Sequence, residues 1–147
     1  MPNEDAWATL RELVRTQDLA VLGTDGDGHP YTSLVAFDTT EDLRGILFAT
    51  SRETRKYRNL RGNPRVSLLI DNRSHSVADF QRAAAVTVQG TLCPMESPEE
   101  EKLRDHFQRR HPHLREFVGS VDCALVKIKV DRYFLVRRFQ EVLELVP

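Results

Sequence analysis

The chain has 147 residues, the size of one compact domain, so a second domain of ordinary size has no room. Hydrophobic residues make up 40% and charged residues 29% of the sequence, which excludes a disordered chain. The 21 Lys and Arg residues against 22 Asp and Glu residues give a formal net charge of -1. The protein therefore has no overall electrostatic field that would attract it to nucleic acid or to anionic membranes.

Three observations favour a cytoplasmic location. The acidic N-terminus lacks the apolar core of a secretory signal, and no apolar run approaches the ~20 residues that span a bilayer. Cys93 and Cys123 stand far apart, without neighbouring ligand patterns, which argues against a disulfide framework and a structural zinc site. We therefore expect a reduced, cytoplasmic compartment.

The first third of the chain predicts one helix and a three-strand meander. Trp7, Leu10 and Val14 recur at helical spacing within residues 5–15, which is typical of an amphipathic helix. Strands are predicted over residues 19–23, from about 30 to 37, and over 45–49, joined by an Asp-Gly turn at 24–28 and a polar turn at 39–42.

Capping patterns predict two further helices. The Thr-x-x-Glu pattern at Thr50 predicts a helix over residues 51–61, and the Ser-Pro-x-Glu pattern at Ser97 predicts one that ends near Arg110. Further strands are predicted over residues 65–70, 84–92, 124–130, 133–137 and 142–146, and residues 72–82 as a loop or short helix. Six or seven short strands with turn-length connections predict a mainly β fold, an antiparallel barrel with flanking helices, in a single domain over residues 1–147.

The junction at residues 48–56 has the composition of an anion site. A helix N-terminus exposes unpaired backbone N–H groups. This junction adds the hydroxyls of Thr50, Ser51 and Thr54 and the cations Arg52, Arg55 and Lys56. Residues 51–65 carry a net charge of +5. The pattern indicates a phosphate-sized anion site, with a solvated basic helix face as the alternative.

Other candidate sites have weaker support in the sequence. The glycines at 23–28 lie in a hairpin turn, which disfavours a dinucleotide loop, and the aspartates there lack the glutamate of a calcium loop. The histidines 106, 111 and 113 lack the partners of a metal site and are interpreted as surface or structural residues. Asn72 and Arg73 follow a buried strand, where a loop at the barrel mouth could meet a ligand, so they are secondary candidates.

Several segments resemble, in order and spacing, the pyridoxamine-phosphate-oxidase-like FMN-binding split barrels. The matching segments are residues 30–37, 47–50, 54–56, 59–60 and 63–68, and the resemblance covers most of residues 5 to 95. Residues 97–146 are more similar to the uncharacterised small bacterial members and to the haem-utilisation branch. It implies a Greek-key split β-barrel of six or seven antiparallel strands with flanking helices. It also implies a homodimer with two FMN molecules at the subunit interface.

The resemblance further implies the roles of the site residues. The strand from Tyr31 to Ala36 lies along the flavin ring and ribityl chain, the turn at residues 49–50 touches the cofactor, and Arg55 and Lys56 hold its phosphate. With the anion site and the barrel-mouth loop, the predicted cofactor-binding residues are Tyr31, Thr32, Ser33, Leu34, Val35, Ala36, Ala49, Thr50, Ser51, Thr54, Arg55, Lys56, Asn72 and Arg73.

We therefore predict an FMN-dependent oxidoreductase that acts on a small molecule. The closing segment 137–140 lacks the histidine of the Arg-x-His motif near the C-terminus of the true oxidase, so the resemblance does not extend to pyridoxamine phosphate as substrate. A non-catalytic FMN electron carrier and a haem-binding protein stay open as alternatives. Haem-degrading members use a histidine near a chain end, whereas no histidine follows His113 here.

Overall fold

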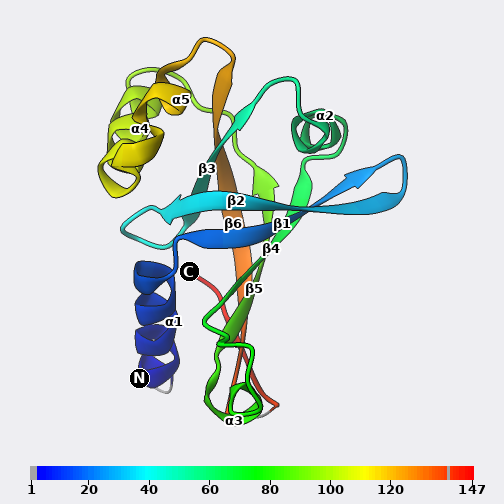
Figure 1. Ribbon diagram of the computed structural model, residues 1–147, viewed down its shortest axis with the longest axis vertical. Helices are drawn as coiled ribbons and strands as arrows, with labels where there is room; N and C mark the ends of the chain where they lie inside the picture. The colour runs from blue at the N-terminus through cyan, green and yellow to red at the C-terminus, as the bar shows by residue number, and fades with distance from the viewer. Residues whose placement is uncertain (1–2, 139) are drawn as a thin grey trace.

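The computed structural model describes residues 3–138 and 140–147, so Phe139 of the closing segment lies outside the described residues. Seven antiparallel strands form one sheet in the order β3-β2-β1-β4-β5-β6-β7, and β3 also pairs with β6. This second pairing closes six strands into a barrel, and β7 extends the sheet beside β6 (Figure 1). The predicted antiparallel barrel with flanking helices is confirmed.

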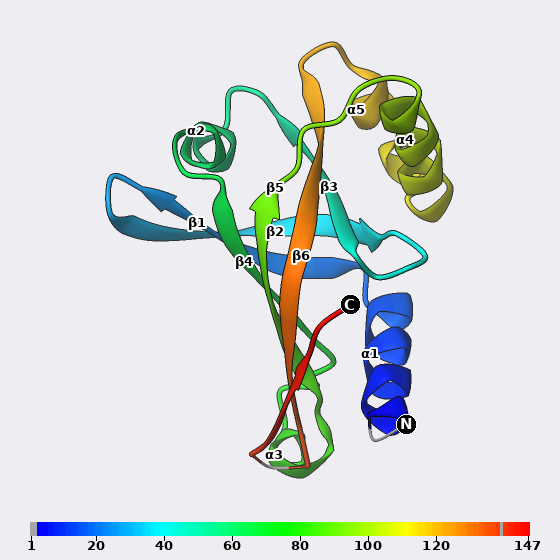
Figure 2. The same cartoon turned by 180° about the vertical axis from the view of Figure 1, so that it is seen from behind.

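The strands are β1 (Leu19–Gly26), β2 (His29–Thr39), β3 (Gly45–Ser51), β4 (Arg65–Asp71), β5 (Ala85–Leu92), β6 (Cys123–Arg137) and β7 (Glu141–Leu145). The helices are α1 (Glu4–Thr16), α2 (Arg55–Gly62), α3 (Asp79–Arg82), α4 (Glu99–Arg110), α5 (Arg115–Gly119) and the 3-10 turn η1 (Pro112–Leu114). Figures 1 and 2 show α2, α4 and α5 around one end of the barrel and α3 at the other. None of the helices in these described ranges is long and apolar enough to cross a membrane.

The main core fills the barrel and extends to α1. Leu22, Phe37 and Phe48 are fully buried inside the barrel, and Leu10 of α1 packs against the same cluster, as the helical spacing predicts. A second, smaller cluster lies outside the barrel, where Leu47 of β3 packs under α4 and α5. The two clusters place apolar side chains on both faces of β3, so this strand is buried on both sides.

The hairpin between β1 and β2 has the predicted Asp-Gly turn. Asp27 and Gly28 both have positive φ, 50° and 84°, the combination that a two-residue type I′ turn requires. Because this turn is tight, Gly26 still pairs with His29. The first strand therefore reaches three residues beyond the predicted end at residue 23.

Both predicted capping boxes are wrong in detail. Strand β3 continues to Ser51, which pairs with Cys123 of β6, so Thr50 lies inside the sheet and Thr54 caps α2 instead. Helix α4 begins at Glu99 without a side-chain cap, because the Ser97 hydroxyl bonds the Glu101 carboxylate. Capping patterns marked these helices but misplaced their first residues.

The two predicted strands at 124–130 and 133–137 form one strand, β6. Its neighbour β5 shifts register between Gln89 and Gly90, and this bulge lets one continuous strand bend around the barrel. A Cβ at Gly90 would lie 2.5 Å from the Lys129 carbonyl oxygen. Only glycine therefore allows the two backbones to approach so closely here.

Candidate functional site

Strand β2 leaves part of one backbone edge without a strand partner. On one side, β1 pairs with β2 from His29 to Ala36. On the other side, β3 pairs only with residues 37–39, so among the described residues no strand covers residues 31–36 there. Unpaired backbone N–H and C=O groups need hydrogen-bond partners. This edge is therefore available to a ligand.

Strand β3 forms the other border of this split. Phe48 still faces Phe37 of β2. Beyond it, Ala49 and Thr50 pair only with β6 among the described strands. The two strands thus part at one point, and the predicted residues of β2 and β3 flank the resulting split. The sequence pattern did not indicate where these strands would separate.

Side chains of β2 alternate between the barrel side and the outer face. Val35 is buried in the core, whereas Thr32 and Leu34 are exposed. Ser33 lies on the same side as Val35, and its hydroxyl oxygen is buried without a hydrogen-bond partner. A buried hydroxyl without a partner costs roughly 1–3 kcal/mol. A polar ligand bound in the split could supply the hydrogen bond that the Ser33 hydroxyl lacks.

The hydroxyls at the start of α2 shape the junction. The Thr54 hydroxyl accepts a hydrogen bond from the Tyr57 N–H at 3.4 Å and donates to the Ser51 carbonyl oxygen at 2.9 Å. The Thr50 and Thr54 hydroxyl oxygens lie 2.8 Å apart. These bonds end β3 and begin α2 within three residues, so Thr50 and Thr54 hold the turn that presents the cations.

Two of the three predicted cations remain available. Arg52 donates to the carbonyl oxygens of Val121 and Cys123, at 2.7 and 2.9 Å, and so fastens the junction to the start of β6. Neither Arg55 nor Lys56 has an ion-pair partner among residues 3–138 and 140–147. The Arg55 guanidinium lies 5.8 Å from the centre of the Tyr31 ring, so the structure brings the predicted β2 and α2 residues together.

Two asparagines that the sequence analysis assigned no role hold α2 against the β1–β2 hairpin. The Asn59 amide donates to the Thr24 hydroxyl, and the Asn63 amide donates to the Asp25 carboxylate, each at 3.2 Å. A Cβ at Gly26 would lie 2.5 Å from the Asn59 side-chain oxygen. Asn59 lies in α2 and Asn63 is the extended residue that follows it, so the available signal was a pair of amides at the end of the helix.

Asn72 and Arg73 lie in the segment that joins β4 to α3, and Figure 1 shows α3 at the opposite end of the barrel from α2. The Asn72 side-chain oxygen accepts the Ala84 N–H at 2.7 Å, and Arg73 pairs with Asp71 at 2.7 Å. In the same loop, the Ser74 N–H and then the Ser74 hydroxyl lower the pKa of Asp79 to about 2. Within one chain, these two residues do not meet the other candidates.

The two helix-end histidines bond to β2. The His106 ring lies 3.1 Å from the Asp38 carboxylate and 2.9 Å from the Thr39 carbonyl oxygen. His111 is buried, and its Nε2 lies 2.7 Å from the Phe37 carbonyl oxygen. Across residues 3–138 and 140–147, no group of three or more His, Cys, Asp or Glu side chains could hold a metal ion.

Comparison with known families decides the family membership. The family model for pyridoxamine 5'-phosphate oxidase matches residues 6–143. The chain belongs to the pyridoxamine 5'-phosphate oxidase family. The match includes both the segments quoted above and most of the C-terminal third of the chain. A comparison with curated protein sequences gave no significant match.

Solved structures of three proteins share the split-barrel fold. A haem-binding protein from Mycobacterium smegmatis is 20% identical, with a TM-score of 0.83 over 92% of this chain and 55% of its own. The haem storage protein HutZ from Vibrio cholerae is 18% identical, with a TM-score of 0.73 over 89% and 93%. An FAD-binding protein from Mesorhizobium loti is 16% identical, with a TM-score of 0.69 over 87% and 91%. This chain therefore spans about half of the mycobacterial protein.

Proposed function

We propose that this family member binds FMN in the split between β2 and β3 and uses it to oxidise or reduce a small molecule. The observation that carries the proposal is the unpaired edge of β2, which leads to the free cations Arg55 and Lys56 at the start of α2. When bound, FMN supplies hydride or electron transfer, and the protein supplies binding and orientation.

The donors at the start of α2 suit a phosphate dianion. Arg55 offers a planar pair of N–H donors and Lys56 a mobile ammonium. The first helical turn adds backbone N–H groups and the positive end of the helix dipole. Because Thr54 already caps the Tyr57 N–H, the groups left for a phosphate are those nearer the start of the helix.

The flat part of the cofactor would lie along residues 31–36. The peptide groups of this edge can bond the polar rim of a flavin ring, and the buried Ser33 hydroxyl lacks any other partner among the described residues. The small side chain of Ala49 borders the split from β3. These contacts orient a ligand without requiring a charged side chain beside the ring.

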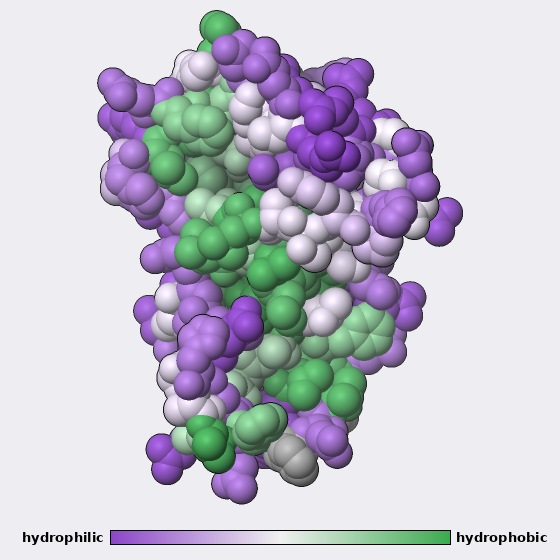
Figure 3. Space-filling model, turned by 45° about the vertical axis from the view of Figure 1, so that its right-hand side comes forward, coloured by the Kyte–Doolittle hydropathy of each residue, from purple (hydrophilic) through white to green (hydrophobic). Residues whose placement is uncertain are grey.

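A second copy of the chain is the proposed partner. Leu34, Val21, Leu69, Thr87 and Phe134 lie opposite one another across five successive strands on the outer face. Figure 3 shows hydrophobic side chains gathered in a band down the middle of one face. A mainly apolar, partly exposed band of this kind indicates an interaction surface, and a two-fold dimer would cover it with the same band of its partner.

Absorbance spectroscopy of the purified protein, before and after addition of FMN, tests the cofactor. We expect the flavin bands at ~375 and ~450 nm, the signature of the bound cofactor. Uptake of haemin with a Soret band, together with no uptake of FMN, would overturn the proposal. Repeated turnover of a reduced donor distinguishes an enzyme from an electron carrier.

The double substitution Arg55→Ala with Lys56→Ala tests the phosphate site. We expect FMN affinity to fall at least tenfold, about 1.4 kcal/mol, because both free cations are lost. The matched control, Arg11→Ala with Arg15→Ala, removes the same charge from the exposed face of α1 and leaves affinity within about twofold. If both double substitutions lowered FMN affinity equally, the general loss of positive charge, and not the loss of a specific phosphate site, would account for the lower affinity.

A further inference from the structure

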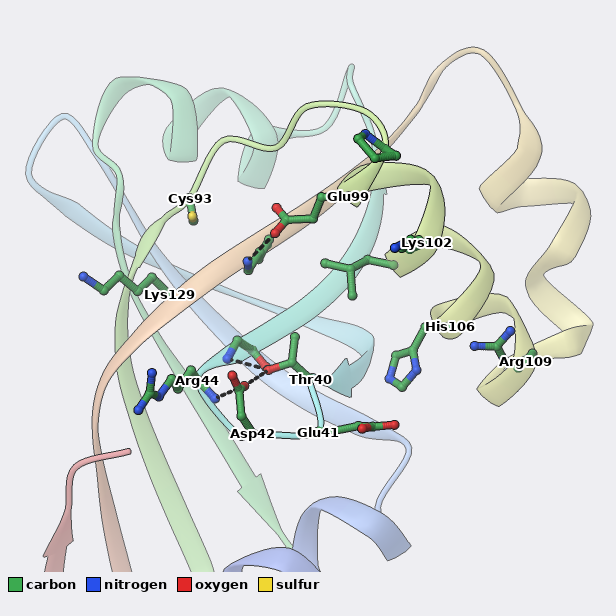
Figure 4. Close-up of a pocket in the computed structure, with 14 residues that line it drawn as sticks. Thr40, Glu41, Asp42, Arg44, Cys93, Glu99, Lys102, His106, Arg109 and Lys129 are labelled. Carbon is green, nitrogen blue, oxygen red and sulfur yellow. Dashed lines mark hydrogen bonds and ion pairs between the residues drawn. The ribbon is translucent and has the colours of Figure 1, made fainter.

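A second cavity lies outside the proposed flavin site. It is a groove of about 910 Å³ between α4 and the strands β3 and β6, closed at one end by the β2–β3 turn (Figure 4). This volume lies within the range of small-molecule sites. None of the predicted cofactor residues lines it, so its ligand would differ from the flavin.

Cations outnumber anions around this groove. The lining cations are Arg44, Lys102, Arg109, Lys127 and Lys129, and the lining anions are Glu41, Asp42 and Glu99. Within the described part of the chain, Lys127 alone among the five cations has an ion pair, with Glu99 at 3.3 Å. Arg44 and Lys129 stand at the outer rim and point away from α4 (Figure 4). The groove therefore favours an anionic ligand, with Lys102, Arg109 and Lys127 as the groups closest to it.

The ion pair of Lys127 joins a mostly buried cation to a half-exposed anion. Lys127 is held within β6 opposite Leu47, and its side chain is 19% exposed, whereas that of Glu99 is 51% exposed. The ammonium has three N–H donors, of which one is directed at Glu99. Figure 4 shows Glu99 reaching from the start of α4 toward the strands. Its carboxylate thus occupies the place where a ligand's anionic group would bind.

A second anchor point lies farther along α4. Lys102 and Arg109 are seven residues apart, hence on one helix face and about 10 Å apart along the axis. His106 lies between them but already bonds Asp38 and Thr39. Leu103 contributes an apolar wall to the groove. The helix therefore offers two free cations beside an apolar wall, in the same groove that Lys127 lines.

We propose that this groove binds a small organic polyanion with at least two carboxylate or phosphate groups. One anionic group displaces Glu99 from Lys127, and another binds Lys102 or Arg109 on α4. This site goes beyond the proposed flavin function and does not depend on it.

Isothermal titration of the full chain with citrate, and separately with pyrophosphate, tests the groove. Glu99→Gln removes the internal competitor and is expected to tighten binding about threefold. Glu101→Gln is the matched control, because it removes the same charge from the same helical turn without a contact to Lys127. Lys102→Gln with Arg109→Gln is expected to weaken binding about tenfold, whereas Arg82→Gln with Arg115→Gln, exposed cations elsewhere, leaves it unchanged.

Binding of citrate alone identifies carboxylates as the recognised groups, and binding of pyrophosphate alone identifies phosphates. Binding of neither probe at millimolar concentration overturns the proposal. Equal tightening by Glu99→Gln and Glu101→Gln also overturns it, because only the former frees Lys127. FMN uptake, followed by absorbance in the same variants, is expected to stay unchanged, which separates this site from the flavin site.

Discussion

Asp38 is a charged residue inside the apolar run of β2, and it is 6% exposed. Its carboxylate lies 3.0 Å from the Arg110 guanidinium and accepts the Thr39 N–H at 2.8 Å. Arg110 also donates to the carbonyl oxygens of Val14 and Gln17 at the end of α1. These carbonyls lack helical partners. One arginine therefore joins α1, β2 and α4.

Replacement of Arg110 by alanine is expected to lower the free energy of unfolding by about 3 kcal/mol. The substitution leaves the buried Asp38 carboxylate without its guanidinium and α1 without two of its terminal bonds. Urea denaturation with an unchanged m-value measures the loss. The neighbouring Arg109→Ala, which removes an unpaired cation, is the control and should cost less than about 0.5 kcal/mol. A loss below about 1 kcal/mol at Arg110 would contradict the assigned role.

Individual residues were predictable where the chemistry is local. The pattern around Arg55 predicted a cationic helix start, and the structure places Arg55 over the ring of Tyr31. The pair of Asp38 and Arg110 joins residues 72 positions apart, which no local pattern connects. The available signal was a carboxylate in an otherwise apolar strand. Asn72 was predicted as a cofactor-binding residue only because its loop follows a buried strand. The pairing of β4 with β5 determines where that loop lies, and it lies far from α2.

At the scale of elements, the start of α2 depends on a strand pairing. The Thr-x-x-Glu rule favours Thr50 as the cap, because Glu53 stands three residues later. Residues 49–51 instead remain extended, since they pair with residues 123–125 of β6. The helix then begins after Thr54, which is extended with φ -77° and ψ 155°. Sequence rules identify the hydroxyl residues and the helix. The pairing with β6, which is distant in the sequence, determines which hydroxyl caps the helix.

Thr54→Ala is expected to cost about 1 kcal/mol of stability, the usual value of a helix cap. Thr54→Ser keeps the hydroxyl and should restore most of the loss. Glu53→Ala is the discriminating control, because the Thr50 capping box would require the Glu53 side chain and the observed cap does not. Urea denaturation of the three variants checks this order. A larger loss for Glu53→Ala than for Thr54→Ala would show that the helix starts earlier in solution.

At the scale of the whole molecule, alternation within strands predicted the barrel, but its closure and its outer face required the structure. Inward side chains at Leu22, Phe37 and Phe48 follow the period of two. The pairing of β3 with β6 joins residues about 80 positions apart and cannot be derived from local pattern. Which side chains lie side by side on the outer face likewise depends on the register of the strands. Leu34 is 63% exposed, and only the aligned strands set it beside Val21 and Leu69 in a continuous band.

Leu34→Asp is expected to convert a dimer into a monomer of 16.9 kDa. In a two-fold interface each substitution appears twice, and the charge would be buried against the partner's apolar band without a counter-ion. Sedimentation equilibrium measures the mass, and Val121→Asp, at an exposed loop away from the band, serves as control and should stay dimeric. A monomeric unsubstituted protein would remove the dimer from the proposal and leave the flavin site, which is tested separately by absorbance.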